Sequence, residues 1–549
     1  MDAVVDDMAH AGWGDPARRT GLPPHAAAWL AEHVGTGVPS TPVPLADVVA
    51  RPSALPVDAR DALQDAVGVA HVRVDHAARV RHAAGRSYLD LVRLRRGEAD
   101  DAPDAVVLPA SAAEVAAVLA ACVRTGTAVV PFGGGTSVVG GVAGLRGRHA
   151  AVVALDLRRM DRLVAVDPVS RTAVFEPGVR GPAAEEALAA HGLTLGHLPQ
   201  SFEHATLGGY AATRSAGQAS TGYGRFDDLV VGLVVQTPAG ELRLGRGAAS
   251  AAGPSLLGLL LGSEGAYGVV TEVTVRVRPL PEVRRHEGAF FRSWAEGVDA
   301  LRALEQAGVA PDVARLSDPD ETRVQLALSG AGRLTRAVLR ARGATCLAVL
   351  GWDGTAASVG ARRAAAREVL AQHGVQWAGT GVGARWEHGR FDGPYLRDDL
   401  LDAGVLVETL ETSATWSRLH EVHGAVRAAL AGALAGTPPV VMCHVSHLYP
   451  HGASLYFTVL ARQSETDPVG QWQRAKAAAT RALVATGATV THHHAVGVDH
   501  RDAMPDEVGA LGVEVLRAVK AVLDPAGVLN PGKLVAPAGE PVGQADSPA

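Results

Sequence analysis

The stretch Pro131-Phe-Gly-Gly-Gly-Thr-Ser137 decides how the rest of the sequence is interpreted. It follows the run Ala128-Val-Val130, whose β-branched residues predict a strand. Three consecutive glycines carry no Cβ atoms, so a ligand can approach the backbone closely. Successive N–H groups in such a turn can bind an anion, and the two hydroxyls add further donors. The alternative is an ordinary surface turn, and the glycines alone do not decide between the two.

Two later stretches have the same character. Residues 199–205 (PQSFEHA) lead into residues 206–217, which are mostly small or hydroxylated. Residues 262–271 (GSEGAYGVVT) place three glycines before a predicted strand, Val270 to Val277. Three such loops in one region expose much backbone. We therefore expect them to surround a long cofactor that carries pyrophosphate and ribityl groups.

The segments around these loops predict mixed strands and helices. Strands are expected at residues 104–108, 151–155, 163–166 and 172–175, and Ser111 with Glu114 forms a capping box that begins a helix. This is an α+β pattern and not a regular βαβ series. Residues 61–98 look helical, and Arg81 and His82 are interpreted there as charges on a solvated helix face.

The composition changes after Pro279 and Pro281, and a second α+β region follows. We expect a helical N-terminal region at residues 1–100, the domain with the glycine loops at 101–280 and a cap domain at 281–490. A C-terminal segment at 491–536 is expected to return to the site. The proline- and glycine-rich residues 537–549 are expected to be a disordered tail.

The composition excludes several classes of protein. The chain has 549 residues, 47% hydrophobic and 20% charged, as in ordinary globular proteins. A net charge of −6 provides no basic field for nucleic acid. The three cysteines (Cys122, Cys346 and Cys443) lie far apart, which favours a reducing compartment. No apolar run has transmembrane length and the first ten residues are acidic, so we expect a cytoplasmic protein.

Histidines gather near the end of the second region. Residues 491–494 (THHH) follow the strand-like run 487–490; in an extended chain His492 and His494 would share one face and His493 the other. His492 and His494 could bind zinc with His444 or His447, but no carboxylate or second cysteine is suitably spaced. Buried histidines with a structural role are a second alternative.

We prefer a general acid–base cluster, because imidazole titrates near neutral pH and Tyr456 provides a phenol partner. Arg315 and Arg397 could supply fixed positive charge for a phosphate or carboxylate. Either arginine could equally lie on a helix surface.

Taken together, these stretches resemble a known superfamily. PFGGGTS, PQSFEHATLGGYAATRSAG, GSEGAYGVVTEV and LDPAGVLNPGKL resemble the vanillyl-alcohol-oxidase/PCMH superfamily of FAD proteins. GWG near the start, HAAGRSYLDLVRLRRG, VARLSD, YLRD, ETLETSATWSRL, SLYF and THHHAVG are similar, in the same order, to alkyldihydroxyacetone-phosphate synthases. The similarity covers about residues 10–535. It implies a PCMH-type FAD-binding domain of two subdomains, an α+β cap domain that binds substrate, and N-terminal helices.

The resemblance also implies a reaction. These enzymes replace the acyl chain of acyl-dihydroxyacetone phosphate with a fatty alcohol, without net redox change, while flavin N5 holds the dihydroxyacetone carbon. It implies a homodimer, and lipid substrates favour peripheral contact with a membrane. No histidine in the FAD loops marks a covalent link, so we expect non-covalent FAD. An FAD-linked dehydrogenase or oxidase of a D-2-hydroxy acid would share the fold, and a non-enzymatic flavin- or metal-binding protein is a third alternative.

Individual roles follow from the matching motifs. The resemblance assigns proton transfer to Tyr456, the essential histidines to His492, His493 and His494, an arginine near the flavin to Arg315, and substrate contact to Arg397. It assigns FAD contacts to Pro131, Phe132, Gly133, Gly134, Gly135, Thr136, Ser137, Pro199, Gln200, Ser201, Phe202, Glu203, His204, Ala205, Ala212, Thr213, Arg214, Ser215, Glu264, Gly265, Ala266, Tyr267, Gly268, Val269 and Val270. One departure is Ala495, where the family has glycine after the histidines.

Overall fold

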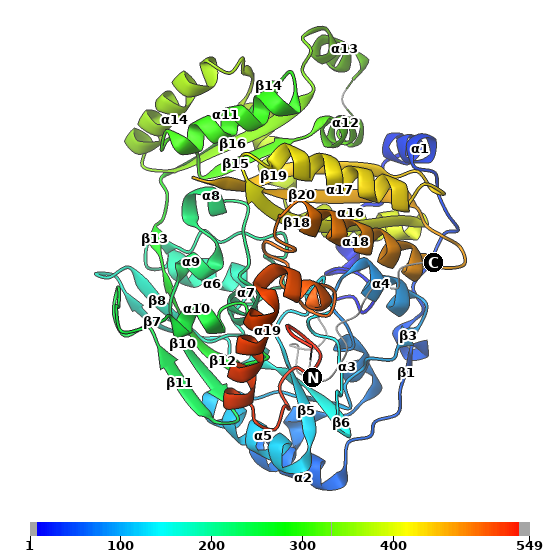
Figure 1. Ribbon diagram of the computed structural model, residues 1–549, viewed down its shortest axis with the longest axis vertical. Coiled ribbons are helices and arrows are strands. Elements are labelled where there is room, and N and C mark those ends of the chain that lie inside the picture. Colours follow the sequence, from blue (N-terminus) through cyan, green and yellow to red (C-terminus); the bar gives the residue numbers. More distant parts are fainter. Residues whose placement is uncertain (1–7, 331, 537–549) are drawn as a thin grey trace.

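The first glycine loop directly follows the edge strand of a small sheet, which lies in the lower part of the molecule (Figure 1). The computed structural model describes residues 8–330 and 332–536, so the predicted tail lies outside the described residues. The sheet has the order β2 (Val72–Arg73), β4 (Ala105–Val107), β6 (Ala151–Asp156) and β5 (Thr127–Phe132), and β4, β6 and β5 are parallel. Helix α5 (Ala112–Thr125) connects β4 to β5. It begins at Ser111, whose hydroxyl accepts from the Glu114 N–H, and ends at Gly126, which has a left-handed backbone.

The second and third glycine stretches belong to a five-stranded antiparallel sheet and its helices. Its order is β11 (Gly240–Leu244), β10 (Val230–Thr237), β12 (Val269–Arg276), β8 (Thr172–Phe175) and β7 (Leu163–Asp167). Along β12 buried residues alternate with partly exposed ones, and the buried face joins a core with α6 (Gly181–Ala189) and α7 (Leu207–Thr213). The predicted mixed α+β fold class is confirmed.

The cap is a seven-stranded antiparallel sheet in the upper part of the molecule (Figure 1). Its order is β17 (Gln376–Gly379), β14 (Val283–Phe291), β16 (Cys346–Gly354), β15 (Val313–Ser317), β19 (Val440–Tyr449), β20 (Gly452–Arg462) and β18 (Val405–Thr415). Apolar side chains of this sheet form the largest core with α11 (Trp294–Gln306), α14 (Ala356–Ala371), α17 (Leu419–Ala433) and α18 (Pro468–Ala485).

The remaining elements are shorter or connect these sheets. The helices are α1 (Pro24–His33), α2 (Val57–Val67), α3 (His76–Arg81), α4 (Tyr88–Arg95), α8 (Ser220–Tyr223), α9 (Phe226–Leu229), α10 (Leu256–Leu260), α12 (Pro319–Leu328), α13 (Arg333–Ala341), α15 (Thr380–Gly389), α16 (Gly393–Asp402) and α19 (Met504–Leu523). Short strands pair as β1 (Val49–Ala50) with β3 (Glu98–Ala99), and as β9 (Leu193–Thr194) with β13 (Arg278–Pro279).

The segment 61–98 is not one helix, because the chain breaks at Gly68 and again before α3 and α4. His82 is therefore buried, with only 1% of its surface exposed. Its Nε2 lies 3.0 Å from an Asp156 carboxylate oxygen, and its ring packs on Phe132. The interpretation of His82 as a solvated charge is therefore wrong. Arg81 remains partly exposed and donates to the Met8 carbonyl.

The chain returns to the glycine loop after α19. The Val129 N–H donates to the Val528 carbonyl, and the Asn530 N–H donates to the Val129 carbonyl, so residues 528–530 run beside β5. Asn530 also donates to the Glu264 carbonyl over 2.6 Å. The C-terminal segment thus fastens the first glycine loop to the third. Across residues 8–330 and 332–536 we find no helix both long and apolar enough to span a membrane.

Candidate active site

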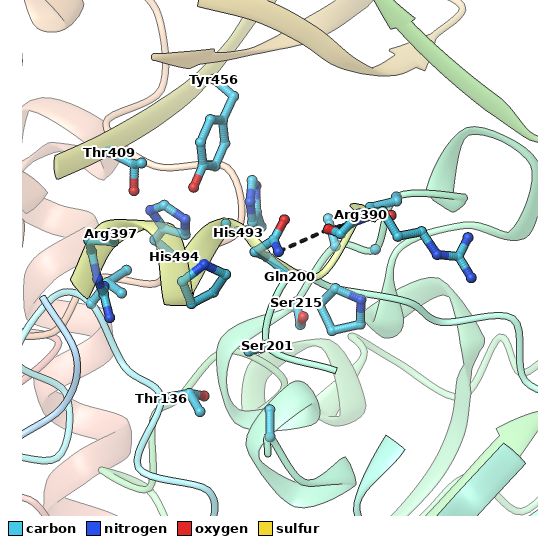
Figure 2. Close-up of a pocket in the computed structure, with 18 of the residues that line it drawn as sticks. Thr136, Gln200, Ser201, Ser215, Arg390, Arg397, Thr409, Tyr456, His493 and His494 are labelled. Atoms are coloured by element: carbon cyan, nitrogen blue, oxygen red, sulfur yellow. Dashed lines mark hydrogen bonds between the residues drawn. The ribbon is translucent and has the colours of Figure 1, made fainter. Parts of the chain in front are cut away.

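All three glycine-rich stretches meet at one cavity of about 800 Å³ between the lower sheets and the cap. Every residue from Pro131 to Ser137 lines it. The other two stretches contribute Pro199, Gln200, Ser201, Ala205, Ala212, Thr213, Ser215, Glu264, Gly265, Gly268 and Val270. Figure 2 shows Thr136, Ser201 and Ser215 on one side of this cavity, with Tyr456 and Thr409 on the other.

The glycines allow close packing between loops as well as room for a ligand. A Cβ on Gly134 would lie 2.1 Å from the His204 carbonyl oxygen, and one on Gly133 would lie 2.4 Å from Thr206 Oγ1. Among the described residues, no protein acceptor pairs with the amide N–H groups of Gly134, Gly135 and Thr136. A backbone cradle with free donors fits an anionic cofactor such as the pyrophosphate of FAD.

Several residues of the predicted FAD stretches point elsewhere. Phe202 stacks on Phe391, Glu203 pairs with Arg18 at 2.7 Å, and His204 contacts Trp13 edge to face. None of these three predicted residues lines the cavity.

Arg214 also turns away from the main cavity. Its guanidinium donates to the Leu261 carbonyl at 2.9 Å and to the Gly258 carbonyl at 2.5 Å. In the third stretch Ala266, Tyr267 and Val269 are buried in the core, and the Tyr267 hydroxyl donates to the Leu516 carbonyl. These side chains hold the loops in place and do not face the cavity.

Tyr456 projects from β20 into the cavity, as Figure 2 shows. Its ring stacks on His444 with 5.0 Å between centroids, and lies 6.0 Å from the His493 ring and 5.6 Å from that of His494. Burial raises the pKa of Tyr456 to about 12, although a hydrogen bond with the Thr409 side chain lowers it. The phenol is therefore protonated at neutral pH and can donate to a ligand.

The histidine run is shaped by Glu411, a buried residue of β18. Its carboxylate accepts from the N–H groups of His492 (2.5 Å), His493 (3.1 Å) and His494 (2.8 Å). Three successive N–H groups can converge on one carboxylate only if the backbone curls, and residues 487–494 indeed form no strand. The predicted alternation is wrong: His493 and His494 line the main cavity together, while His492 lines a second cavity.

The imidazoles at the cavity are bases that stay uncharged. Burial lowers the pKa of His493 and of His494 to about 4, although the Glu411 carboxylate raises both. Burial likewise lowers the pKa of His447 to about 3, and its Nε2 lies 2.9 Å from the Gly217 carbonyl. At neutral pH the site thus combines a protonated phenol, which can donate a hydrogen bond, with free-base imidazoles, which can accept one.

Both predicted arginines line the cavity. Arg315 lies on β15 and donates to Glu321 at 2.6 Å, with His444 Nδ1 3.0 Å from the same nitrogen. Arg397 lies on α16 and donates through Nη1 to the Arg86 carbonyl. Its Nε and Nη2 are buried without a hydrogen-bond partner among the described residues. Buried, unpartnered guanidinium donors are costly unless a ligand satisfies them, and an anion is the best match.

One wall of the cavity is apolar. It is built from the N-terminal segment, α12, α16 and two strands of the cap: Leu22, Ala26, Trp29, Leu30, Val324, Leu328, Leu400, Met442 and Leu460. Such a wall can bury an alkyl chain at about 25 cal/mol per Å² of apolar surface. The polar and apolar parts form one continuous cavity, so an amphipathic ligand fits it as a whole.

Sequence reasoning missed Glu411. The only signal was that two acidic residues, Glu408 and Glu411, lie within the strand Val405–Thr415. Glu411 lies with His492 and His493 in an arrangement that could hold a metal ion, with ligand atoms within 4.8 Å. Its oxygens already accept from three backbone N–H groups and from the Thr491 hydroxyl, however, which leaves them poorly available to a metal.

Comparison with known proteins agrees with this architecture. Residues 103–245 match the family "FAD binding domain", and residues 280–534 match "FAD linked oxidases, C-terminal domain". The alkyldihydroxyacetonephosphate synthase of Dictyostelium discoideum is 32% identical over 84% of this chain and 78% of its own. That of Trypanosoma brucei brucei is 33% identical over 86% of this chain and 80% of its own. A solved alkyldihydroxyacetonephosphate synthase structure superposes with a TM-score of 0.84 at 27% identity, covering 97% of this chain and all of that one.

The fold and the loops define an FAD-dependent enzyme of the FAD-linked oxidase type. Within that class, the chain belongs to the alkyldihydroxyacetonephosphate synthase family. The predicted cofactor and the predicted kind of enzyme are thereby confirmed.

Proposed function

We propose that this protein makes an ether lipid precursor by exchanging the acyl chain of acyl-dihydroxyacetone phosphate for a fatty alcohol, without net redox change. The observation that carries the proposal is the composition of the main cavity. Glycine-loop backbone, a protonated phenol, neutral imidazoles, unpartnered guanidinium donors and an apolar wall all border the same space. The glycine-loop backbone suits a flavin, and the phenol and the imidazoles suit proton transfers. The guanidinium donors suit a phosphate, and the apolar wall suits an alkyl chain.

Each group of this chain would have a distinct task. Residues 131–137, together with the cavity-lining parts of residues 199–215 and 264–270, would hold FAD non-covalently through backbone and hydroxyl contacts. The flavin would supply a nucleophilic ring nitrogen. Arg397 would bind the substrate phosphate through Nε and Nη2, which lack a partner among the described residues.

Side chains at the cap side of the cavity would transfer the protons. The protonated Tyr456 would donate a hydrogen bond to the substrate, and the free-base His493 and His494 would accept protons from the carbon or the alcohol that reacts. Arg315, held by Glu321, would keep a fixed positive charge at the same wall. The apolar wall formed by α1, α12 and their neighbours would exclude water from the alkyl chain.

The decisive experiment incubates purified, FAD-loaded protein with acyl-dihydroxyacetone phosphate and labelled hexadecanol. We expect label in alkyl-dihydroxyacetone phosphate, one fatty acid released per label incorporated, and no lasting bleaching of the flavin. Absence of label would refute the proposal. Anaerobic bleaching by a D-2-hydroxy acid would instead identify the protein as a dehydrogenase or oxidase.

A further inference from the structure

A row of short hydrogen bonds leads away from the main cavity. His493 Nδ1 lies 2.9 Å from His492 Nδ1, and His492 Nε2 lies 2.5 Å from the Tyr449 hydroxyl oxygen. His493 lines the main cavity, His492 is buried behind it, and Tyr449 is partly exposed at the end of β19. The row therefore leads from the main cavity through a buried imidazole to a side chain that is partly exposed.

A second cavity lies behind the histidines. It has a volume of about 420 Å³ and is lined by His492, His493 and Arg225, but neither by His494 nor by Tyr456. Arg225 donates to the His492 carbonyl at 3.0 Å and so fixes the backbone of the row from this side. His493 lines both cavities, so this residue forms part of the wall between them.

The proposed exchange needs such a route. An alcohol and an ester give an ether, a carboxylate and one proton, so one proton must leave the site in every turnover. The reacting centre would then be covered by FAD and by an alkyl chain against the apolar wall, which exclude the bulk water that could carry the proton away.

We propose that His493, His492 and Tyr449 form a proton relay that exports the proton of the alcohol from the main cavity. This inference rests on the proposed function. In the resting relay His493 Nδ1–H donates to His492 Nδ1, His492 Nε2–H donates to Tyr449, and the Tyr449 O–H donates outward. When His493 Nε2 accepts the alcohol proton, each proton moves along by one bond and one proton leaves from Tyr449.

The surroundings suit a relay that carries charge only briefly. Burial holds the pKa of His492 well below its ordinary value, so the ring keeps its one N–H proton but does not hold a second proton at neutral pH. The Glu411 carboxylate, 3.5 Å from His493 Nδ1, favours positive charge while a proton passes. Glu411 also fixes the backbone of both histidines, which keeps the ring nitrogens at hydrogen-bond distance.

The test is Tyr449→Phe in the FAD-loaded protein. This change removes the last hydroxyl of the relay and keeps the ring. We expect kcat for exchange to fall about 10²-fold or more, as for loss of one proton-transfer group. The bound flavin and the KM for acyl-dihydroxyacetone phosphate should remain unchanged. Imidazole in the buffer should restore turnover in a saturable way, because a diffusing base can take the proton from His492.

Tyr223→Phe is the matched control. It also removes a hydroxyl with one hydrogen bond, here to Asp353 at 3.1 Å, and Tyr223 lines neither cavity. Its turnover should equal that of the wild type and should not respond to imidazole. This comparison separates a proton-transfer defect from a general effect of losing a buried hydroxyl.

Wild-type turnover by Tyr449→Phe, or a slow variant that imidazole does not restore, would overturn the relay. If Tyr449→Phe fails to bind FAD, His492→Gln replaces it, with the same expected slowing and the same imidazole response, and its failure to show them has the same meaning. A wild-type protein without any exchange activity would instead refute the proposed function itself.

Discussion

Glu411→Gln tests whether one buried carboxylate holds the histidines in their working position. In the wild type, Oε1 accepts from the Thr491 hydroxyl and from the N–H groups of His493 and His494, and Oε2 accepts from the His492 N–H. A glutamine can keep the three bonds of Oε1, but its NH₂ group must then face the His492 N–H. The variant loses one charge-assisted hydrogen bond and leaves a buried donor unpaired, which costs about 3 kcal/mol.

Hydrogen exchange of the amides at residues 492–494 measures this cost. A loss of about 3 kcal/mol corresponds to roughly a hundredfold faster exchange through local opening. Turnover should fall as well, because His493 and His494 lose their fixed positions. The control is Glu421→Gln on α17, an exposed carboxylate paired with Arg418, which should change neither quantity. Unchanged protection at residues 492–494 in Glu411→Gln would refute the assignment of this role.

The same carboxylate predicts how the segment responds to acid. Burial alone would raise the pKa of Glu411, but the adjacent His493, His494 and His492 hold it well below its ordinary value. A carboxyl group whose pKa is depressed by folding stabilises the folded state above its ordinary pKa, and this stabilisation is lost as the pH falls through the folded value. Burial also lowers the pKa of His493 and of His494 to about 4, so below the ordinary histidine pKa the opened segment binds more protons than the folded one. Protection of residues 492–494 should therefore decline as the pH falls from about 6.5 toward 4, and the stabilisation by Glu411 should be lost in stronger acid. Protection that stays constant between about pH 6.5 and 4 would contradict this account.

Three further variants test other parts of the site. Tyr456→Phe should keep the flavin spectrum and lower turnover about 10²- to 10⁴-fold, and wild-type turnover would remove this residue from the reaction. Gly134→Val should lose FAD, because its Cβ would lie 2.1 Å from the His204 carbonyl oxygen and force two loops apart; stoichiometric FAD in the purified variant would contradict that. Ala495 has φ 73°, which favours glycine. Ala495→Gly should relieve about 1–2 kcal/mol of strain against about 0.4–1 kcal/mol of added chain entropy, and so raise the urea midpoint slightly; a lower midpoint would argue against strain there.

Local patterns were sufficient to predict the fold class and the cofactor. A glycine loop after a strand carries its geometry within a few residues, because backbone freedom and exposed N–H groups depend on the loop itself. Residues 131–137 accordingly all line the cavity, as do parts of the other two stretches. The alternation of strands and helices likewise follows from periodicity and caps such as Ser111.

Local patterns could not predict which side chains of the second and third glycine stretches face the cavity. Arg214 and Tyr267 lie in the predicted motifs but bond to carbonyls of Gly258, Leu261 and Leu516. Which side of a loop faces a cavity depends on what packs behind it, and those partners lie far along the chain.

The sequence was enough to specify an FAD enzyme with three glycine loops, a cap and a histidine run. Only the tertiary structure decided how that run works. Glu411 lies about eighty residues before the histidines, yet its carboxylate accepts hydrogen bonds from their three backbone N–H groups. The curled backbone that results places His493 and His494 at the main cavity and His492 at the second cavity. The reason is that a buried carboxylate must satisfy its oxygens from whatever donors the fold brings close, and that proximity is created only when β18 and the C-terminal segment meet.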